Sequence, residues 1–251
     1  MISEMNIKAS ILSTMPVARE LINKAAGLGI ALDNSSFIQI NPVTDSETTD
    51  EVLELCLLPV TAVFTSVNAV KAVAGIVLNA DPEWSIYCIG NATMDAVNKR
   101  FNAATVKGVA ADAAALATII IEDTIGEVVL FCGDKRMDTL PDTLRDNDIV
   151  VYEEVVYKTI ATPHVATQGY DGILFFSPTA ADSFFSANKI GATTVLFAIG
   201  NTTADAIKKH CDNKVIVSET ASKEVVADYA VQYFLNGPGK ATGALNNKTD
   251  Q

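Results

Sequence analysis

The sequence predicts an α/β protein with two doubly wound parallel-sheet domains, one of them discontinuous, joined by a two-stranded β-ladder that acts as a hinge. Short apolar runs alternate with stretches of helical periodicity, which is typical of parallel sheets covered by helices on both faces. A phrase of eleven residues occurs at 89–99 and again at 199–209, with seven identical positions. Two strand–helix–strand patterns, at 8–32 and 127–151, also resemble each other. These repeats predict two similar halves.

The duplication extends upstream of the repeated phrase. Residues 62–70 align with 173–181, so that Phe64 matches Phe175 and Ser66 matches Ser177 at an offset of 111 positions. Gly90 and Gly200 are 110 positions apart. A slip of one residue between the two blocks is easily placed in a surface connection, so the two blocks belong to one repeated unit.

The predicted elements follow from local pattern. The strand-like apolar runs are residues 8–12, 37–40, 62–65, 85–89, 128–132, 149–152, 173–176, 194–199 and 214–217. Helical periodicity covers residues 17–26, 68–77, 93–101, 113–121, 180–187, 203–210 and 223–234. The alternation of these two lists produces the βαβ pattern on which the fold prediction rests.

The domain boundaries follow from where the second repeat pair lies. The copy at residues 127–151 lies at the end of the middle part of the chain, and the copy at residues 8–32 lies near the amino terminus. The simplest assembly is a discontinuous domain of residues 1–40 plus 158–251, with residues 41–157 inserted as the second domain. The chain then crosses between domains near 37–43 and near 155–161, and both segments are β-prone. We therefore expect them to pair as the ladder.

Composition argues against several classes of partner. The net charge is −12, whereas nucleic-acid binders need a basic face to contact phosphates, and anionic lipid repels an acidic surface. No apolar run reaches the roughly 18 residues of a membrane helix. Residues 1–10 contain Glu4 and lack the apolar stretch of a signal peptide. We expect a cytoplasmic monomer that binds neither nucleic acid nor membrane.

Cysteine and histidine usage argues against a metal centre. The four cysteines form no Cys-x-x-Cys pair, and Cys88 and Cys132 lie within apolar runs, where a thiol behaves as a small buried hydrophobe. The only histidines, His164 and His210, are far apart in the sequence. No cluster has metal-ligand spacing, so we expect no metal.

Six loops follow predicted strands and lead towards helices: residues 13–16, 66–68, 90–93, 133–136, 177–179 and 200–203. They are rich in small, hydroxylic and amide side chains. Ligands of open parallel sheets bind at such strand ends, and helix starts offer unpaired amides that bind anions. A simpler interpretation is that Ser66, Thr93, Ser177 and Thr203 only cap their helices. The same loop order in both halves favours binding.

One aromatic side chain lies at the second crossing. Tyr157, within residues 155–159, is either a packed strand tyrosine or a donor aimed at a ligand. Strand propensity alone favours the packed tyrosine.

Taken together, these segments resemble the uroporphyrinogen-III synthase family. The resemblance is carried in order by residues 64–70, 89–93, 129–134, 156–159, 175–180 and 198–203, about two-thirds of the chain. Two departures stand out. The first loop reads Ser13-Thr-Met-Pro16 where the family often has Thr-Arg-Pro, and Asn91 and Asn201 stand where proline is frequent.

The resemblance implies dehydration and cyclisation of hydroxymethylbilane, with inversion of its last pyrrole ring, in tetrapyrrole biosynthesis and without metal or organic cofactor. It implies that Tyr157 donates a proton to the leaving hydroxyl. The implied substrate-binding residues are Ser66, Asn68, Gly90, Thr93, Gly133, Lys135, Ser177, Thr179, Gly200, Thr202 and Thr203. An alternative is a non-catalytic two-domain protein that closes on a small polyanion. A regulatory module derived from the enzyme is a third interpretation.

Overall fold

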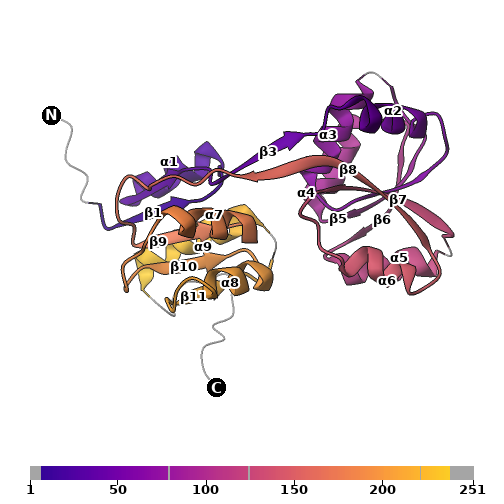
Figure 1. Cartoon of the computed structure of the whole chain (residues 1–251). Helices are drawn as coiled ribbons and strands as arrows, with labels where there is room; N and C mark the ends of the chain where they lie inside the picture. The colour runs from indigo at the N-terminus through magenta and orange to yellow at the C-terminus, as the bar shows by residue number, and fades with distance from the viewer. Residues whose placement is uncertain (1–6, 79, 124, 221, 238–251) are drawn as a thin grey trace. The chain divides into compact units, whose positions relative to one another are not determined.

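The computed structural model of the chain describes residues 7–78, 80–123, 125–220 and 222–237. The chain divides into two compact units (Figure 1). Unit 1 comprises Met1–Gln39 and Ala161–Gln251, and unit 2 comprises Ile40–Ile160. Each unit contains its own parallel sheet, which confirms the predicted fold class.

Unit 1 is built on a five-stranded parallel sheet. Its strands run in the order β11-β10-β9-β1-β2, so the amino-terminal βαβ unit lies beside strands from the far end of the chain. The elements are β1 (Ala9–Ser13), α1 (Arg19–Gly27), β2 (Ile30–Asn34), β9 (Gly172–Phe175), α7 (Pro178–Ala187), β10 (Val195–Ala198), α8 (Asn201–Lys208), β11 (Val215–Val217) and α9 (Lys223–Asn236).

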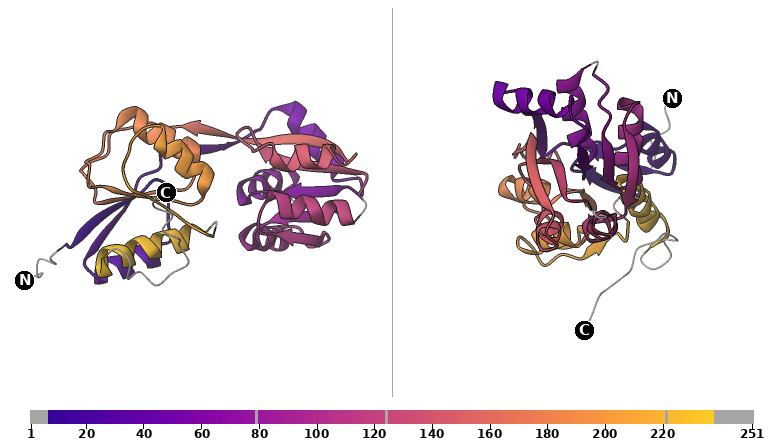
Figure 2. Two further views of the ribbon diagram at one scale, coloured as in Figure 1. Left: turned by 90° about the horizontal axis from the view of Figure 1, so that it is seen from below. Right: turned by 90° about the vertical axis from the view of Figure 1, so that its right-hand side faces the viewer.

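Alternation along the strands of unit 1 divides its core into two layers. In β9, Leu174 packs with α1 and α9 on one face, while Ile173 and Phe175 pack with α7 and α8 on the other. Figure 2 shows this sheet between its two helix layers. Successive strand side chains point to opposite faces, so a continuous apolar run is required where both faces are covered.

Unit 2 contains a six-stranded sheet with the order β3-β8-β7-β4-β5-β6. Its elements are β3 (Ile38–Pro42), α2 (Ser46–Leu55), β4 (Thr61–Phe64), α3 (Val67–Val77), β5 (Ser85–Ile89), α4 (Asn91–Arg100), β6 (Thr105–Ala110), α5 (Ala113–Glu122), β7 (Glu127–Gly133), α6 (Thr139–Arg145) and β8 (Val150–Ala161). Helices α2, α3 and α4 pack on one face, and α5 and α6 pack on the other.

The two units share one strand order in a permuted chain. In unit 2 the order β8-β7-β4-β5-β6 corresponds to β2-β1-β9-β10-β11 in unit 1. The βαβ segment that comes last along the chain in unit 2 therefore has its counterpart first along the chain in unit 1. This correspondence confirms the predicted duplication and explains why one domain must be discontinuous.

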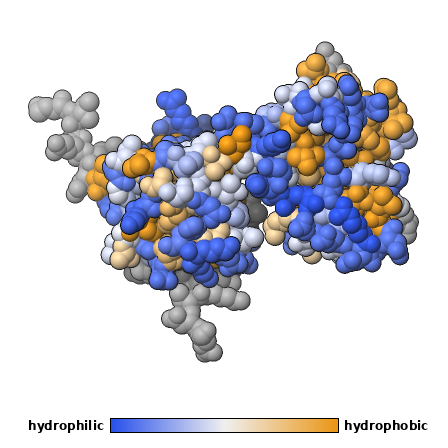
Figure 3. Space-filling view, in the orientation of Figure 1, coloured by the Kyte–Doolittle hydropathy of each residue, from blue (hydrophilic) through white to orange (hydrophobic). Residues whose placement is uncertain are grey.

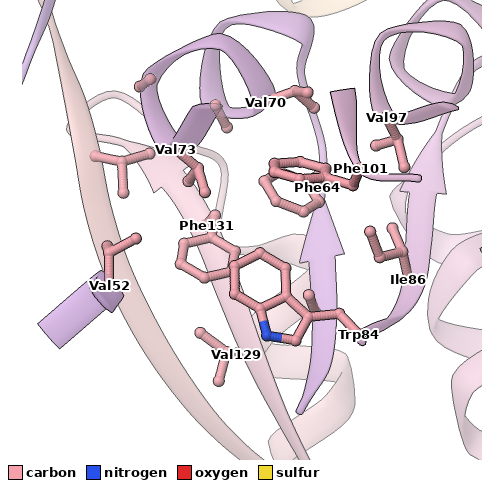
Figure 4. Close-up of a cluster of buried hydrophobic side chains, with 14 of the residues drawn as sticks. Val52, Phe64, Val70, Val73, Trp84, Ile86, Val97, Phe101, Val129 and Phe131 are labelled. Carbon is pink, nitrogen blue, oxygen red and sulfur yellow. The ribbon is translucent and has the colours of Figure 1, made fainter. Parts of the chain in front are cut away.

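Aromatic side chains fill one core layer of unit 2 (Figure 4). Phe131 stacks on Phe64 at 5.1 Å and on Trp84 at 5.3 Å between ring centroids. The Trp84 indole N–H donates to the Leu55 carbonyl at 3.0 Å, so its polar atom is satisfied. Complete burial of each large side chain contributes roughly 1.5–3 kcal/mol, which makes this layer a rigid support for the loops above it.

Strands β3 and β8 connect the units, as predicted, and are neighbours in the sheet. The Val43 amide donates to Val156 O at 2.9 Å, and the Thr162 amide donates to Phe37 O at 2.9 Å. These bonds lie beyond the two ends of β3, so pairing extends along the whole crossing.

Two elements escaped the sequence analysis. Helix α2 buries only Val52 among its ten residues, so it shows little apolar periodicity. Strand β6 contains Lys107 and Gly108, and its register with β5 shifts there. It also lies at the sheet edge, where one side of the strand needs no partner. Weak burial in both cases removed the signal on which the prediction relied.

Candidate functional site

Each sheet has a point where the direction of strand addition reverses. It lies between β4 and β7 in unit 2 and between β9 and β1 in unit 1. Ligands of doubly wound sheets bind outside the carboxyl ends of the strands at such a switch point. The predicted loops after β4, β7 and β9 lie at these positions, so the topology makes them candidate ligand-binding loops.

In unit 2 the switch point carries a compact group of residues. The Tyr157 hydroxyl lies 3.2 Å from Ser66 Oγ, and Ser66 directly precedes α3. Gly133, the last residue of β7, lies beneath the Tyr157 ring. A Cβ at Gly133 would overlap ring carbons and lie 2.8 Å from the phenol oxygen. Three predicted site residues, Ser66, Gly133 and Tyr157, are therefore brought together within one unit.

A β-bulge aims the tyrosine at this position. Cys132 pairs with Val155, but Gly133 pairs with Tyr157, so Val156 is an extra residue in β8. In a regular strand, neighbouring side chains would point to opposite faces. Here Val156 and Tyr157 both pack against the same core layer. Bulges next to functional sites commonly redirect a side chain in this way.

Asp134 fastens the bulge, and the sequence analysis gave it no role. Its amide donates to Tyr157 O at 3.1 Å, and its Oδ1 accepts from the Thr159 amide at 2.7 Å. These two bonds hold β8 on both sides of Lys158. A glycine at the end of an apolar strand does signal close approach, but the register shift itself leaves no mark in the sequence.

The environment of Tyr157 keeps its hydroxyl protonated at neutral pH. Burial raises the pKa of Tyr157 above its usual value of 10.0, and the hydrogen bond to Ser66 acts in the opposite direction. Nearby Cys132 and Asp134 add to the upward shift. The side chain can therefore serve as a proton donor, because the neutral phenol is its dominant form.

Two of the predicted loops contain true serine caps. Ser66 Oγ accepts from the Ala69 amide at 3.2 Å, and Ser177 Oγ accepts from the Ala180 amide at 3.1 Å. Both residues have nearly the same extended backbone. The capping interpretation is thus correct for these two serines.

The same interpretation is wrong for Thr93 and Thr203. Helices α4 and α8 begin three residues earlier than the capping interpretation requires, with Gly90 and Gly200 at the N-cap position and no side-chain cap. Both threonines are buried in the first turn instead. A helix start without a side-chain cap leaves its first amides available to an anion. Gly90 has φ +79°, a conformation that suits glycine.

The remaining predicted residues lie around these helix starts. Asn68 and Thr179 are half-buried in the first turns of α3 and α7, while Thr202 is exposed in the first turn of α8. Lys135 is exposed in the turn after β7. Its neighbour Arg136 forms ion pairs with Glu153 and Asp138, so its charge is already balanced and it is a poor candidate for attracting an anionic ligand.

In unit 1 a histidine, His164, holds the segment after β2. Its Nδ1 lies 2.9 Å from Thr162 O and its Nε2 lies 2.6 Å from Ser35 Oγ. A carbonyl can only accept, so Nδ1 carries a proton, and in the neutral imidazole Nε2 accepts from Ser35. His164 also stacks on Phe37 at 4.0 Å. The arrangement ties together the two segments that leave unit 1, a structural role.

A groove of about 400 Å³ lies at the opposite edge of the unit 2 sheet. Its lining includes Thr61 and Glu127, the first residues of β4 and β7. Burial and the neighbouring Glu51 raise the pKa of Glu154 in this groove to about 7. Because it lies at the amino ends of the strands, it is separate from the switch point.

The visible surface is mainly hydrophilic with separate apolar areas (Figure 3). No helix in the described part of the chain is long and apolar enough to cross a membrane. Within residues 7–78, 80–123, 125–220 and 222–237, no three His, Cys, Asp or Glu side chains gather as metal ligands would.

Comparison with known proteins identifies the fold. A mutant uroporphyrinogen III synthase from the extremely thermophilic bacterium Thermus thermophilus aligns with a TM-score of 0.59 and 16% identity, over 88% of this chain and 96% of that one. Uroporphyrinogen-III synthetase from Helicobacter pylori aligns with a TM-score of 0.61 and 15% identity, over 89% and 98%. No curated protein sequence matches this chain.

Family membership rests on the sequence itself. Residues 19–227 match the model of the family described as "Uroporphyrinogen-III synthase HemD". The match spans parts of both units, from α1 to α9. The chain therefore belongs to the uroporphyrinogen-III synthase HemD family.

Proposed function

We propose that the chain is a uroporphyrinogen-III synthase, a hydro-lyase that converts hydroxymethylbilane to uroporphyrinogen III. Family membership supports this activity. The observation that carries the proposal is the Tyr157 hydroxyl, held by Ser66 above Gly133 at the switch point of unit 2. A protonated donor at a ligand-binding edge is what loss of a hydroxyl group requires.

The proposed chemistry begins at the hydroxymethyl group. As its C–O bond breaks, Tyr157 Oη gives its proton to the departing oxygen, and water leaves. The pyrrole nitrogen supplies the electron pair, so an azafulvene forms. Attack by the substituted carbon of the last ring on the azafulvene methylene forms a spiro intermediate. The bond from that carbon to its original methylene bridge then breaks and releases a second azafulvene. The free α-carbon of the last ring closes on this azafulvene, and the proton lost from that carbon restores the phenol. General acid assistance of this kind contributes about 10²–10⁴-fold.

Positioning accounts for the inversion. The free substrate closes without inverting its last ring, so the protein must favour attack at the substituted position. Holding reacting groups in a near-attack geometry can lower a barrier by several kcal/mol, roughly 7–11 in favourable cases. We propose that this positioning, more than any one side chain, determines the isomer that forms.

Main-chain donors are proposed to hold the substrate carboxylates. The uncapped starts of α4 and α8, at Gly90 and Gly200, offer amides to anions in each unit. Each helix start contributes roughly 0.3–1 kcal/mol when exposed and more when partly buried. Local donors are needed because a net charge of −12 cannot attract a substrate with eight carboxylates over long range.

The activity is tested by incubating the protein with hydroxymethylbilane, oxidising the products and separating the type I and type III isomers. We expect type III product in excess of the uncatalysed type I product. Type I alone, formed at the rate seen without protein, would contradict the proposal. Tight binding of hydroxymethylbilane without turnover would instead support a non-catalytic polyanion-binding protein.

A further inference from the structure

The Ser66 side chain makes two hydrogen bonds at once. Its Oγ lies 3.2 Å from the Ala69 amide and 3.2 Å from the Tyr157 hydroxyl. The first bond caps α3. The second reaches across the end of β7 to a strand 91 positions away in sequence, so it is not part of helix capping.

The first bond leaves the serine proton available for the second. The Ala69 amide can only donate, so it occupies one lone pair of Ser66 Oγ and leaves the serine proton and a second lone pair free. Among the described residues, the Tyr157 oxygen is the only further hydrogen-bond partner of Ser66 Oγ, and either oxygen can be the donor of that bond. When the serine donates, the phenol proton is free to point towards a ligand.

We propose that Ser66 donates to the Tyr157 oxygen and is thereby a positioning residue, which orients the Tyr157 hydroxyl and makes it a stronger acid. This inference rests on the proposed function. A donor to the phenol oxygen stabilises the phenolate that remains when the proton is given away, and hydrogen bonds to charged groups are the stronger ones. The Ala69 amide at the helix start polarises the serine in the same direction.

Two further observations support this role. The hydrogen bond from Ser66 lowers the pKa of Tyr157 against the larger effect of burial. In unit 1, Ser177 caps α7 with the same geometry, and its Oγ makes no other hydrogen bond within the described residues. Capping alone therefore requires no tyrosine, and the link to Tyr157 is an additional feature of unit 2.

Two substitutions separate capping from positioning. Ser66→Gly removes the hydroxyl but retains a good N-cap residue, so the melting temperature should change by no more than a few degrees. Ser66→Thr keeps the hydroxyl and should retain near-native activity. We expect Ser66→Gly to lower kcat by about tenfold with little change in KM. Ser222→Gly removes the cap of α9 and is the control for cap loss away from the site.

The acidity of Tyr157 is measured by NMR titration of protein labelled with ¹³C at the tyrosine ζ carbon, with Tyr157→Phe to assign the signal. Ser66→Gly should make Tyr157 a roughly tenfold weaker acid. An unchanged titration, or an equal loss of kcat when Ser66→Gly is made in the Tyr157→Phe background, would overturn the proposal.

The titration does not depend on turnover. If wild-type protein formed no type III isomer, the proposed function would fail, whereas the titration would still decide whether Ser66 donates to Tyr157. If wild-type protein turned over and Ser66→Gly changed neither kcat nor the titration, only the positioning role would be wrong.

Discussion

The two units have the same elements around the switch point, but different residues lie there. Both contain a serine-capped helix after the central strand and a glycine-started helix after the next strand. In unit 2, Gly133 pairs with Tyr157, whereas in unit 1 the equivalent pair is Ser13 and Asn34. The comparison teaches that duplication supplied the same helix starts in both units, while the proposed proton donor belongs to unit 2.

The largest effect is expected from Tyr157→Phe. The variant lacks the proton donor but keeps the ring, so type III formation should slow by about 100-fold while the fold remains intact. Stopped reactions analysed for isomers measure the rate, and circular dichroism checks the fold. Tyr152→Phe removes an exposed phenol from the same strand, and Asn34→Ala changes the equivalent position of unit 1. If either control slowed the reaction as much as Tyr157→Phe does, the proposed contrast between the units would be wrong.

The next largest effect concerns Gly133. A methyl group there would displace the Tyr157 ring, because the ring already occupies that space. We expect Gly133→Ala to lower kcat by about tenfold. Gly75→Ala is the matched control, since nothing lies within 4 Å of a Cβ at that helical position. It should stabilise the protein by about 0.5–1 kcal/mol. Full activity of Gly133→Ala would mean that the ring position is unimportant.

A smaller effect is expected from a carboxylate at the amino edge of the unit 2 sheet. The groove of unit 2 contains Glu154, whose pKa is raised to about 7 by burial and by Glu51. In unit 1 a pocket beside the start of β9, which Tyr170 and Ile173 help to line, has no carboxylate in its described lining. The folded protein binds this proton more tightly than the unfolded chain. The associated stability is therefore complete below the ordinary carboxyl pKa and is lost as pH rises through 7.

Denaturant unfolding at pH 5 and pH 8 measures this loss. Glu154→Gln should reduce the loss of unfolding free energy by about 1 kcal/mol, after allowance for solvent screening of a half-buried group. Glu122→Gln, which removes a carboxylate from the exposed end of α5, is the control. An equal loss of unfolding free energy between pH 5 and pH 8 in wild type and Glu154→Gln would show that Glu154 does not hold a proton in the groove.

The smallest effect is expected from salt. If main-chain donors hold the substrate, its affinity should fall less than about tenfold between roughly 50 and 200 mM salt, because few free cationic side chains are involved. Equilibrium binding to the slow Tyr157→Phe variant measures this. A steep loss would show that lysines such as Lys135 capture the substrate instead.

Much of the architecture could be predicted because buried strands and repeated phrases are local signals. Helix α2 and strand β6 escaped detection because they bury little. The site was only partly predictable. Loops after strands predicted Ser66 and Gly133, and the crossing between domains together with the family resemblance predicted Tyr157. The contact between these residues depends on the bulge at Val156 and on Asp134. Register shifts arise from pairing between distant segments, so a linear pattern does not record them.

The most direct test varies the acidity of Tyr157 itself. Fluorinated tyrosines placed at position 157 keep the ring and hydroxyl while making the phenol more acidic. If this phenol is the proton donor, the pH above which type III formation declines should fall in step with the phenol pKa, and the isomer ratio should stay constant. A pH profile that remains fixed across the fluorinated series would contradict the account.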